Sequence, residues 1–176
     1  MAGEEEKVDN DLVVASNSMG LELVRRLSAA ATDPTNVFVS PVSVALALGM
    51  AANGASGKTL AGILKTLHLD RWDIAAANDG LSGLMDDLEG DDLGAELAVA
   101  NSLWLRQGLP FRQDYLDAVR AYYQARVSSL DFRAADAAAT INAWVAEQTR
   151  ERIQEIVNPP IDPQAILFLI NAVYFK

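Results

Sequence analysis

The chain has 176 residues, enough for one domain with a substantial core, and 51% of them are apolar, which excludes an intrinsically disordered protein. Its 14 basic and 24 acidic residues give a net charge of −10, so nucleic acids and anionic membranes, which attract clustered lysine and arginine, are not expected partners. The absence of cysteine excludes disulfides, thiolate metal sites and a cysteine nucleophile.

Residues 1–8 are polar and acidic, and we interpret them as a disordered leader before a single domain over residues 9–176. They lack the apolar core of a secretory signal, so the chain as written is expected in the cytoplasm. The longest apolar runs are too short to span a bilayer. A first helix should begin at Asp9 or Asn10, because apolar residues then recur along one helical seam: Leu12, Met19, Leu23 and Leu27.

Residues 36–68 organise the chain. A short β-type run, 37–39, precedes Ser40, a good N-cap, and Pro41, which suits the first position of a helix. The side chains of 42–52 are apolar on nearly every face, which predicts a buried helix. Asn53-Gly54 should end this helix in the left-handed conformation. A second helix follows, with an apolar face made by Leu60, Ile63, Leu64 and Leu67.

The later segments alternate between helix and strand. The acidic stretch 70–92 predicts one irregular helix, and 96–106 predicts a strand covered on both faces because it is apolar on both. A helix around residues 115–123 and a short strand over 125–132 come next. Asp136 can cap a long helix that runs past Ile156 and ends at Asn158-Pro159-Pro160, and 165–175 predicts a central strand. Trp104 and Trp144 are expected as anchors of the core.

No catalytic or metal-binding constellation emerges, so we expect no enzyme, no metal and no cofactor. Residues 52–59 come close to a phosphate-binding loop, but Ala52 stands where that motif needs glycine, and a helix precedes it. We interpret them as a corner between two helices, with Gly54 left-handed. His68, the sole histidine, is expected to have a structural role at a helix end. The adjacent acids at 86–87 and 91–92 are expected as a solvated surface rather than a calcium site.

Asn171 stands alone among apolar neighbours in the last predicted strand. An unpaired buried amide costs roughly 1–3 kcal/mol, so its side chain requires partners. Either it faces an edge or water, or it is the centre of a polar cluster in an apolar layer.

Several segments together resemble the serpin family of serine protease inhibitors, in the right order and over most of the chain. The resemblance is carried by Asn36-Val-Phe-Val-Ser-Pro-Val-Ser43, Gly54-Ala-Ser-Gly-Lys-Thr59, Val99-Ala-Asn-Ser-Leu-Trp104, Val127-Ser-Ser-Leu-Asp-Phe132, Ile141-Asn-Ala-Trp-Val145 and Leu169-Ile-Asn-Ala-Val-Tyr-Phe-Lys176. It implies an α+β fold in which N-terminal helices pack around part of a large central β-sheet, as an incomplete domain corresponding to the first half of a serpin.

The resemblance also implies a mechanism and site residues. In inhibitory serpins a target serine or cysteine protease cleaves an exposed reactive loop, which inserts into the main sheet while the protease is still acyl-linked. Ser40, Ser43 and Asn171 would form a hydrogen-bonded cluster, the shutter, where the sheet must open. Asn142, Trp144 and Thr149 would anchor the helix that crosses the sheet. The acidic 70–92 region argues against activation by heparin.

The reactive loop lies outside the part of the family that this chain resembles, which leaves three readings open. The chain is part of an inhibitor that acts as a complete molecule, with the remaining half continuous or supplied as a second chain. Alternatively it belongs to a non-inhibitory, scaffold or chaperone-like relative, or is a truncated product. The isolated chain should self-associate through its exposed last strand. The resemblance allows an extracellular location and leaves the target protease unnamed.

Overall fold

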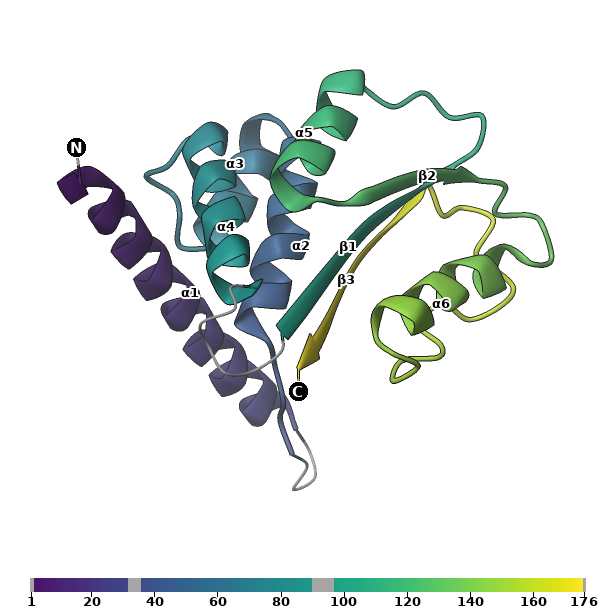
Figure 1. The fold of residues 1–176 in the computed structure, drawn as a ribbon, viewed down its shortest axis with the longest axis horizontal. Helices are drawn as coiled ribbons and strands as arrows, with labels where there is room; N and C mark the ends of the chain where they lie inside the picture. Colours follow the sequence, from purple (N-terminus) through teal and green to yellow (C-terminus); the bar gives the residue numbers. More distant parts are fainter. Residues whose placement is uncertain (1, 32–35, 90–96, 176) are drawn as a thin grey trace. The chain divides into compact units, whose positions relative to one another are not determined.

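A computed structural model of the chain describes residues 2–31, 36–89 and 97–175 (Figure 1). The chain divides into two compact units, residues 1–84 and 85–176, with the boundary inside a helix. The helices of the first unit are α1 (Ala2–Ala30), α2 (Pro41–Asn53), α3 (Gly57–Thr66) and α4 (Ile74–Glu89), the last of which runs on into the second unit. The second unit continues with β1 (Leu97–Arg106), α5 (Gln113–Tyr123), β2 (Arg126–Leu130), α6 (Ala137–Gln148) and β3 (Leu167–Phe175). None of the helices described here is long and apolar enough to cross a membrane.

In the first unit α2 packs against both α1 and α3. Leu46 and Met50 of α2 are fully buried, and its remaining residues are buried or half-buried, which confirms the prediction of an interior helix. The close approach of α1 to the start of α2 depends on Gly20, because a Cβ there would lie 2.5 Å from Cγ of Pro41. The predicted seam of α1 is buried at Leu12 and Met19 and becomes exposed at Leu27.

The first unit differs from the predictions before α2, at the end of α2 and at the start of α1. Residues 36–40 form no strand, and Phe38 is 94% exposed, so the β-type run at 37–39 was wrong for the part of the chain described. Gly54 ends α2 in the right-handed region, with φ −88°, so the left-handed stop was also wrong; the left-handed glycine of this corner is Gly57, with φ +54°. Helix α1 begins at Ala2, within the expected leader 1–8, whose disorder stays a prediction.

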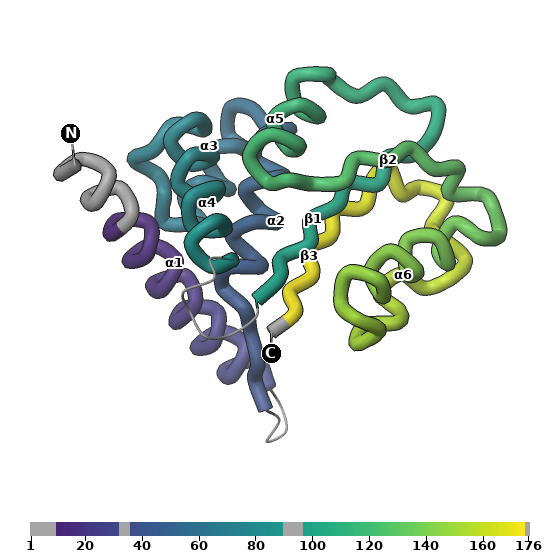
Figure 2. The backbone as a smooth tube through the Cα atoms, in the orientation of Figure 1, coloured from purple at the N-terminus to yellow at the C-terminus, as the bar shows by residue number. Residues whose placement is uncertain are grey.

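The second unit is built on a three-stranded sheet in the order β2-β1-β3. β1 runs parallel to β2 and antiparallel to β3, and Figures 1 and 2 show β1 and β3 lying side by side. β1 is therefore the central strand of the described sheet, and β3, predicted to be central, lies at its edge. Burial of Leu103 on one face and Trp104 on the other confirms that β1 is covered on both faces.

Helix α6 covers one face of this sheet through a buried apolar cluster that includes Ile141, Val145, Trp104 and Ile170. The rings of Trp104 and Trp144 meet edge to face with centroids 6.1 Å apart, which confirms both tryptophans as core anchors. Asp136 precedes α6 but makes no side-chain cap, contrary to the prediction.

α6 also ends at Gln148, well before the predicted stop at the Asn158-Pro159-Pro160 segment. The next residues cannot continue an α-helix because Arg150 and Glu151 take left-handed φ values of +49° and +63°. Ile156, predicted to lie on the apolar face of the helix, is instead 46% exposed.

Candidate functional site

The first pair of predicted shutter residues lies at the start of α2. Ser40 takes an extended conformation, and its hydroxyl accepts a hydrogen bond from the backbone N–H of Ser43 at 3.2 Å, as an N-cap should. The Ser43 hydroxyl in turn donates to Oγ of Ser40 at 2.9 Å. Both side chains are half-buried, so this hydroxyl pair is a local polar centre at the entry to an apolar helix.

The third predicted shutter residue, Asn171, lies in the middle of β3 directly opposite Asn101 of β1. Its Nδ2 donates to Oδ1 of Asn101 at 2.8 Å. Asn101 is 4% exposed and extends the hydrogen-bond network, because its Nδ2 donates to the carbonyl oxygen of Tyr123 at 2.9 Å. Of the two readings of Asn171, these hydrogen bonds favour the polar cluster, which within the second unit is formed with Asn101 and the carbonyl of Tyr123.

One atom of this network is left over. Oδ1 of Asn171 is buried and has no hydrogen-bond partner among the residues that the structure describes. A buried acceptor without a donor costs about 1–3 kcal/mol, so the site is suited to a further donor.

Asn101 is the residue that sequence reasoning missed. It stands in the quoted segment 99–104, and an amide within an apolar strand was a usable signal, as it was for Asn171. Its role depends on the register that places the two asparagines opposite each other, and no local pattern in either strand fixes that register.

A second polar contact secures the opposite face of β1. The indole Nε1 of Trp104 donates to the hydroxyl of Ser102 at 2.9 Å, and Ser102 is fully buried. The tryptophan therefore adds its ring to the α6 cluster without leaving its N–H unpaired.

Asn142, a predicted anchor of the crossing helix, holds the segment that returns from α6 towards β3. Its Oδ1 accepts from the backbone N–H groups of Ile156 and Val157, each at 2.9 Å, and its Nδ2 donates to the carbonyl of Val157 at 2.8 Å. One half-buried amide thus pairs with three backbone groups of a loop that has no regular secondary structure to satisfy them.

Thr149, another predicted anchor, terminates α6. Its hydroxyl donates to the carbonyl of Val145 at 2.8 Å and accepts from the N–H of Ile153 at 3.0 Å. Thr149 is 1% exposed, so both bonds lie in the interior of the second unit. Trp144 lies in the apolar cluster with residues of the sheet, whereas Asn142 and Thr149 bond to α6 and the segment that follows it. That the three together anchor the helix on the sheet stays a prediction.

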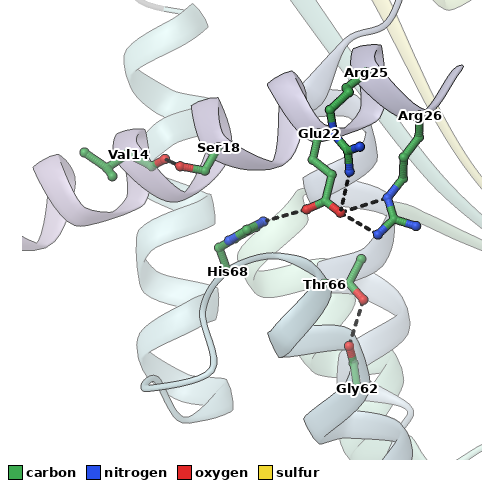
Figure 3. Close-up of polar contacts among 8 residues, drawn as sticks. All are labelled: Val14, Ser18, Glu22, Arg25, Arg26, Gly62, Thr66 and His68. Carbon is green, nitrogen blue, oxygen red and sulfur yellow. Dashed lines mark hydrogen bonds and ion pairs between the residues drawn. The ribbon is translucent and has the colours of Figure 1, made fainter. Parts of the chain in front are cut away.

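His68 follows the end of α3, as predicted. Its side chain faces a carboxylate of α1 and does not cap the last carbonyls of α3. Figure 3 shows its ring pointing to Glu22 of α1, with Nε2 at 3.6 Å from Oε2. Arg26 holds the same carboxylate, its Nε donating to Oε1 at 2.8 Å, and this hydrogen bond lowers the pKa of Glu22 below its ordinary value. The cluster links α1 to the end of α3. Among the described residues, no group of three or more acids and histidines gathers as a metal site.

The structure thus places Ser40 and Ser43 in the first unit and Asn171 in the second. Each half of the predicted shutter has the internal hydrogen bonds given above. Their union into one cluster stays a prediction.

Comparisons with known proteins agree with this architecture. The family model for serpin (serine protease inhibitor) matches residues 14–176. An uncharacterized serpin-like protein of Thermococcus kodakarensis is 38% identical over 96% of this chain, and the leukocyte elastase inhibitor of Bos taurus is 37% identical over 80%. The chain spans 39% and 37% of the length of these two relatives.

Solved structures give the same result. The thermophilic serpin tengpin, in its latent state, superposes with a TM-score of 0.81 at 32% identity, covering 96% of this chain and 44% of tengpin. Human thyroxine-binding globulin superposes with a TM-score of 0.83 at 28% identity, covering 96% and 46%. This chain belongs to the serpin family, and its helices and strands form part of a serpin domain.

Proposed function

We propose that this chain is the sheet-bearing part of a serpin-type inhibitor that traps a serine or cysteine protease by inserting its cleaved reactive loop into the main β-sheet. The molecule then acts by binding and distorting the protease, and not as an enzyme. Because the chain spans about two fifths of its relatives, this activity is proposed for the complete molecule.

The observation that carries the proposal is the edge of β3. Leu167–Phe175 pairs with β1 along its whole length, and no other described strand covers its outer side. Because the chain spans about two fifths of its relatives, this side of β3 is where a strand of the complete molecule, or an inserted loop, would pair its backbone N–H and C=O groups by β-augmentation.

We further propose that Ser40, Ser43 and Asn171 together control the opening of the sheet. The unpartnered Oδ1 of Asn171 needs a donor, and the Ser40–Ser43 pair offers hydroxyl groups. A double-mutant cycle with Ser43→Ala and Asn171→Ala tests this proposal. Direct or shared contact predicts a coupling of about 0.5–3 kcal/mol in the free energy of unfolding, whereas additive losses would show independent sites. Ser18→Ala on α1, cycled with Asn171→Ala, is the control pair.

Protease inhibition is tested on the protein as its source makes it, together with any chain that co-purifies. The protein is incubated with a panel of serine and cysteine proteases, and the products are separated in denaturing detergent. A trapped acyl-enzyme predicts a detergent-stable complex whose mass is the sum of the protease and the cleaved inhibitor. Cleavage of the protein without any such complex across the panel would contradict the proposal.

A non-inhibitory function is the second candidate, favoured by the similarity to human thyroxine-binding globulin. The two candidates differ in whether the loop can enter the sheet. Insertion adds a strand beside β3, so limited proteolysis in the reactive loop should raise the unfolding temperature of an inhibitor. A complete molecule that forms no protease complex and gains no thermal stability on cleavage belongs to the second class.

A further inference from the structure

The second unit contains a cavity of about 490 Å³, lined by none of the predicted shutter or anchor residues. It lies where the end of β1, the start of α6 and the segment before β3 come together. Its lining is mostly alanine, proline and phenylalanine with two arginines: Arg106, Phe132, Arg133, Ala134, Ala135, Ala138, Pro159, Pro160, Ile161 and Pro163. This volume lies within the range of small-molecule sites.

The floor of the cavity is continuous with the core. Phe132, Ala138 and Ile161 are 4%, 3% and 7% exposed, and all three belong to the apolar cluster under α6. Phe132 is fixed edge to face against Phe168, with ring centroids 5.2 Å apart. The floor of the cavity is therefore apolar, which favours a ligand with a hydrocarbon part.

The charge of the cavity opposes that of the chain. The whole protein has a net charge of −10, yet the lining contains two guanidinium groups and no carboxylate among its described residues. No salt bridge to Arg106 or Arg133 occurs within the parts of the chain that the structure describes. Arg106 is half-buried and donates to the carbonyl of Ala165 at 3.3 Å, which keeps its guanidinium at the cavity.

Backbone chemistry distinguishes a small ligand from a peptide. Three lining residues, Pro159, Pro160 and Pro163, have no N–H to offer. A peptide brings backbone carbonyls that need donors, and the main chain of these three residues supplies none. A hydrocarbon chain with one terminal anion has no such requirement.

We propose that this cavity binds a small anionic amphiphile, a carboxylate on an unbranched hydrocarbon chain. The hydrocarbon part packs on Phe132, Ala138 and Ile161, and the carboxylate lies at Arg106 and Arg133. Arginine forms charge-assisted hydrogen bonds with carboxylates, so the two ends of the ligand meet matching chemistry. The proposal is independent of whether the protein inhibits proteases.

The test uses decanoate as the probe and the protein as its source makes it, with binding measured by isothermal titration calorimetry below the micelle range. We expect saturable binding of one decanoate per chain. Arg106→Gln combined with Arg133→Gln should weaken it about tenfold or more, the loss expected for charge-assisted hydrogen bonds. Arg152→Gln, an exposed arginine outside the cavity lining, is the matched control and should leave the affinity unchanged.

Further measurements distinguish the contribution of the carboxylate from that of the hydrocarbon chain. Decanol should bind with equal affinity to the wild type and to the double variant, and acetate should not compete with decanoate. Ala135→Leu, at an exposed wall position, should reduce decanoate binding by filling the mouth while leaving the core intact. The proposal is overturned if decanoate does not saturate, if the double variant binds it as tightly as the wild type, or if acetate displaces it.

Discussion

Single side chains decide where polar groups can lie in this fold. In the second unit, Asn101 and Asn171 share one hydrogen bond across two strands, and Asn101 also binds the carbonyl of Tyr123. In the first unit, Asn53 and Asn78 exchange a pair of amide hydrogen bonds at 2.8 and 2.9 Å. Each asparagine thus satisfies a polar group of its partner, which lowers the cost of burial except at the unpartnered Oδ1 of Asn171.

The Glu22 cluster makes a prediction for pH dependence. Arg26 lowers the pKa of Glu22 in the folded state, so the folded protein binds its proton less readily than the unfolded chain does. The stabilisation is then complete above the unfolded pKa of glutamate, about 4.3, and is lost as the pH falls through the lower folded pKa. Glu22→Gln should lower the urea midpoint at pH 7 by a small amount, because the cluster is solvent-exposed.

The check is a series of urea titrations from neutral to acidic pH. The difference between wild type and Glu22→Gln should shrink as the pH falls below the ordinary glutamate range. Glu155→Gln, an exposed acid without an ion pair among the described residues, is the control. A difference that stays constant down to the acidic end would show that the amide changes packing rather than charge.

At the scale of whole elements, the helices and strands were predictable where local chemistry fixes them. The capped start of α2 follows from Ser40-Pro41, and β1 follows from a run that is apolar on both faces. The early end of α6 did not follow, because the residues from 149 to 156 favour a helix by propensity. Side-chain hydrogen bonds to the backbone override that preference: the Thr149 hydroxyl accepts from the N–H of Ile153 four residues later, and Oδ1 of Asn142 accepts from the N–H of Val157 in the returning segment.

The sequence singled out Asn171 as a polar residue that needs partners, but it did not predict which residue is its hydrogen-bond partner. Asn171 could be singled out because burying an amide in a strand of apolar residues costs free energy unless the amide is hydrogen-bonded. Its partner Asn101 lies 70 positions earlier, and only the pairing of β1 with β3 joins them. The edge position of β3 likewise depends on which strands accompany it, and not on its own apolar sequence.

The return segment after α6 provides a second prediction. Asn142→Leu removes three hydrogen bonds and leaves the N–H and carbonyl of buried Val157 without their partner, so the free energy of unfolding should fall by about 1–3 kcal/mol. Urea denaturation followed by circular dichroism measures the loss. Asn158→Leu, an exposed asparagine in the same segment, is the matched control and should change stability by less than about 0.5 kcal/mol. Equal losses in both variants would assign the effect to the leucine itself.

At the scale of the whole molecule, the proposed inhibition requires a sheet that is stable enough to fold and can still accept another strand. β3 combines nine residues of regular pairing on one side with an outer edge that no described strand covers. Its side chains are mainly apolar, so nothing in its sequence discourages a further strand by charge or proline. If the proposed function holds, this edge receives a loop of its own molecule; in the chain produced alone, it is expected to pair with another copy.

The 1–176 chain produced alone should therefore self-associate. Exposed apolar edge strands template pairing between chains. Sedimentation velocity over a hundredfold range of concentration should show species that grow with concentration. Leu169→Lys, which places a charge in β3, should reduce this growth, whereas Gln164→Lys, outside the strand, should not. A clean monomer at every concentration, with circular dichroism showing a folded chain, would mean that the edge of β3 is protected within this chain and is not the surface that a loop enters.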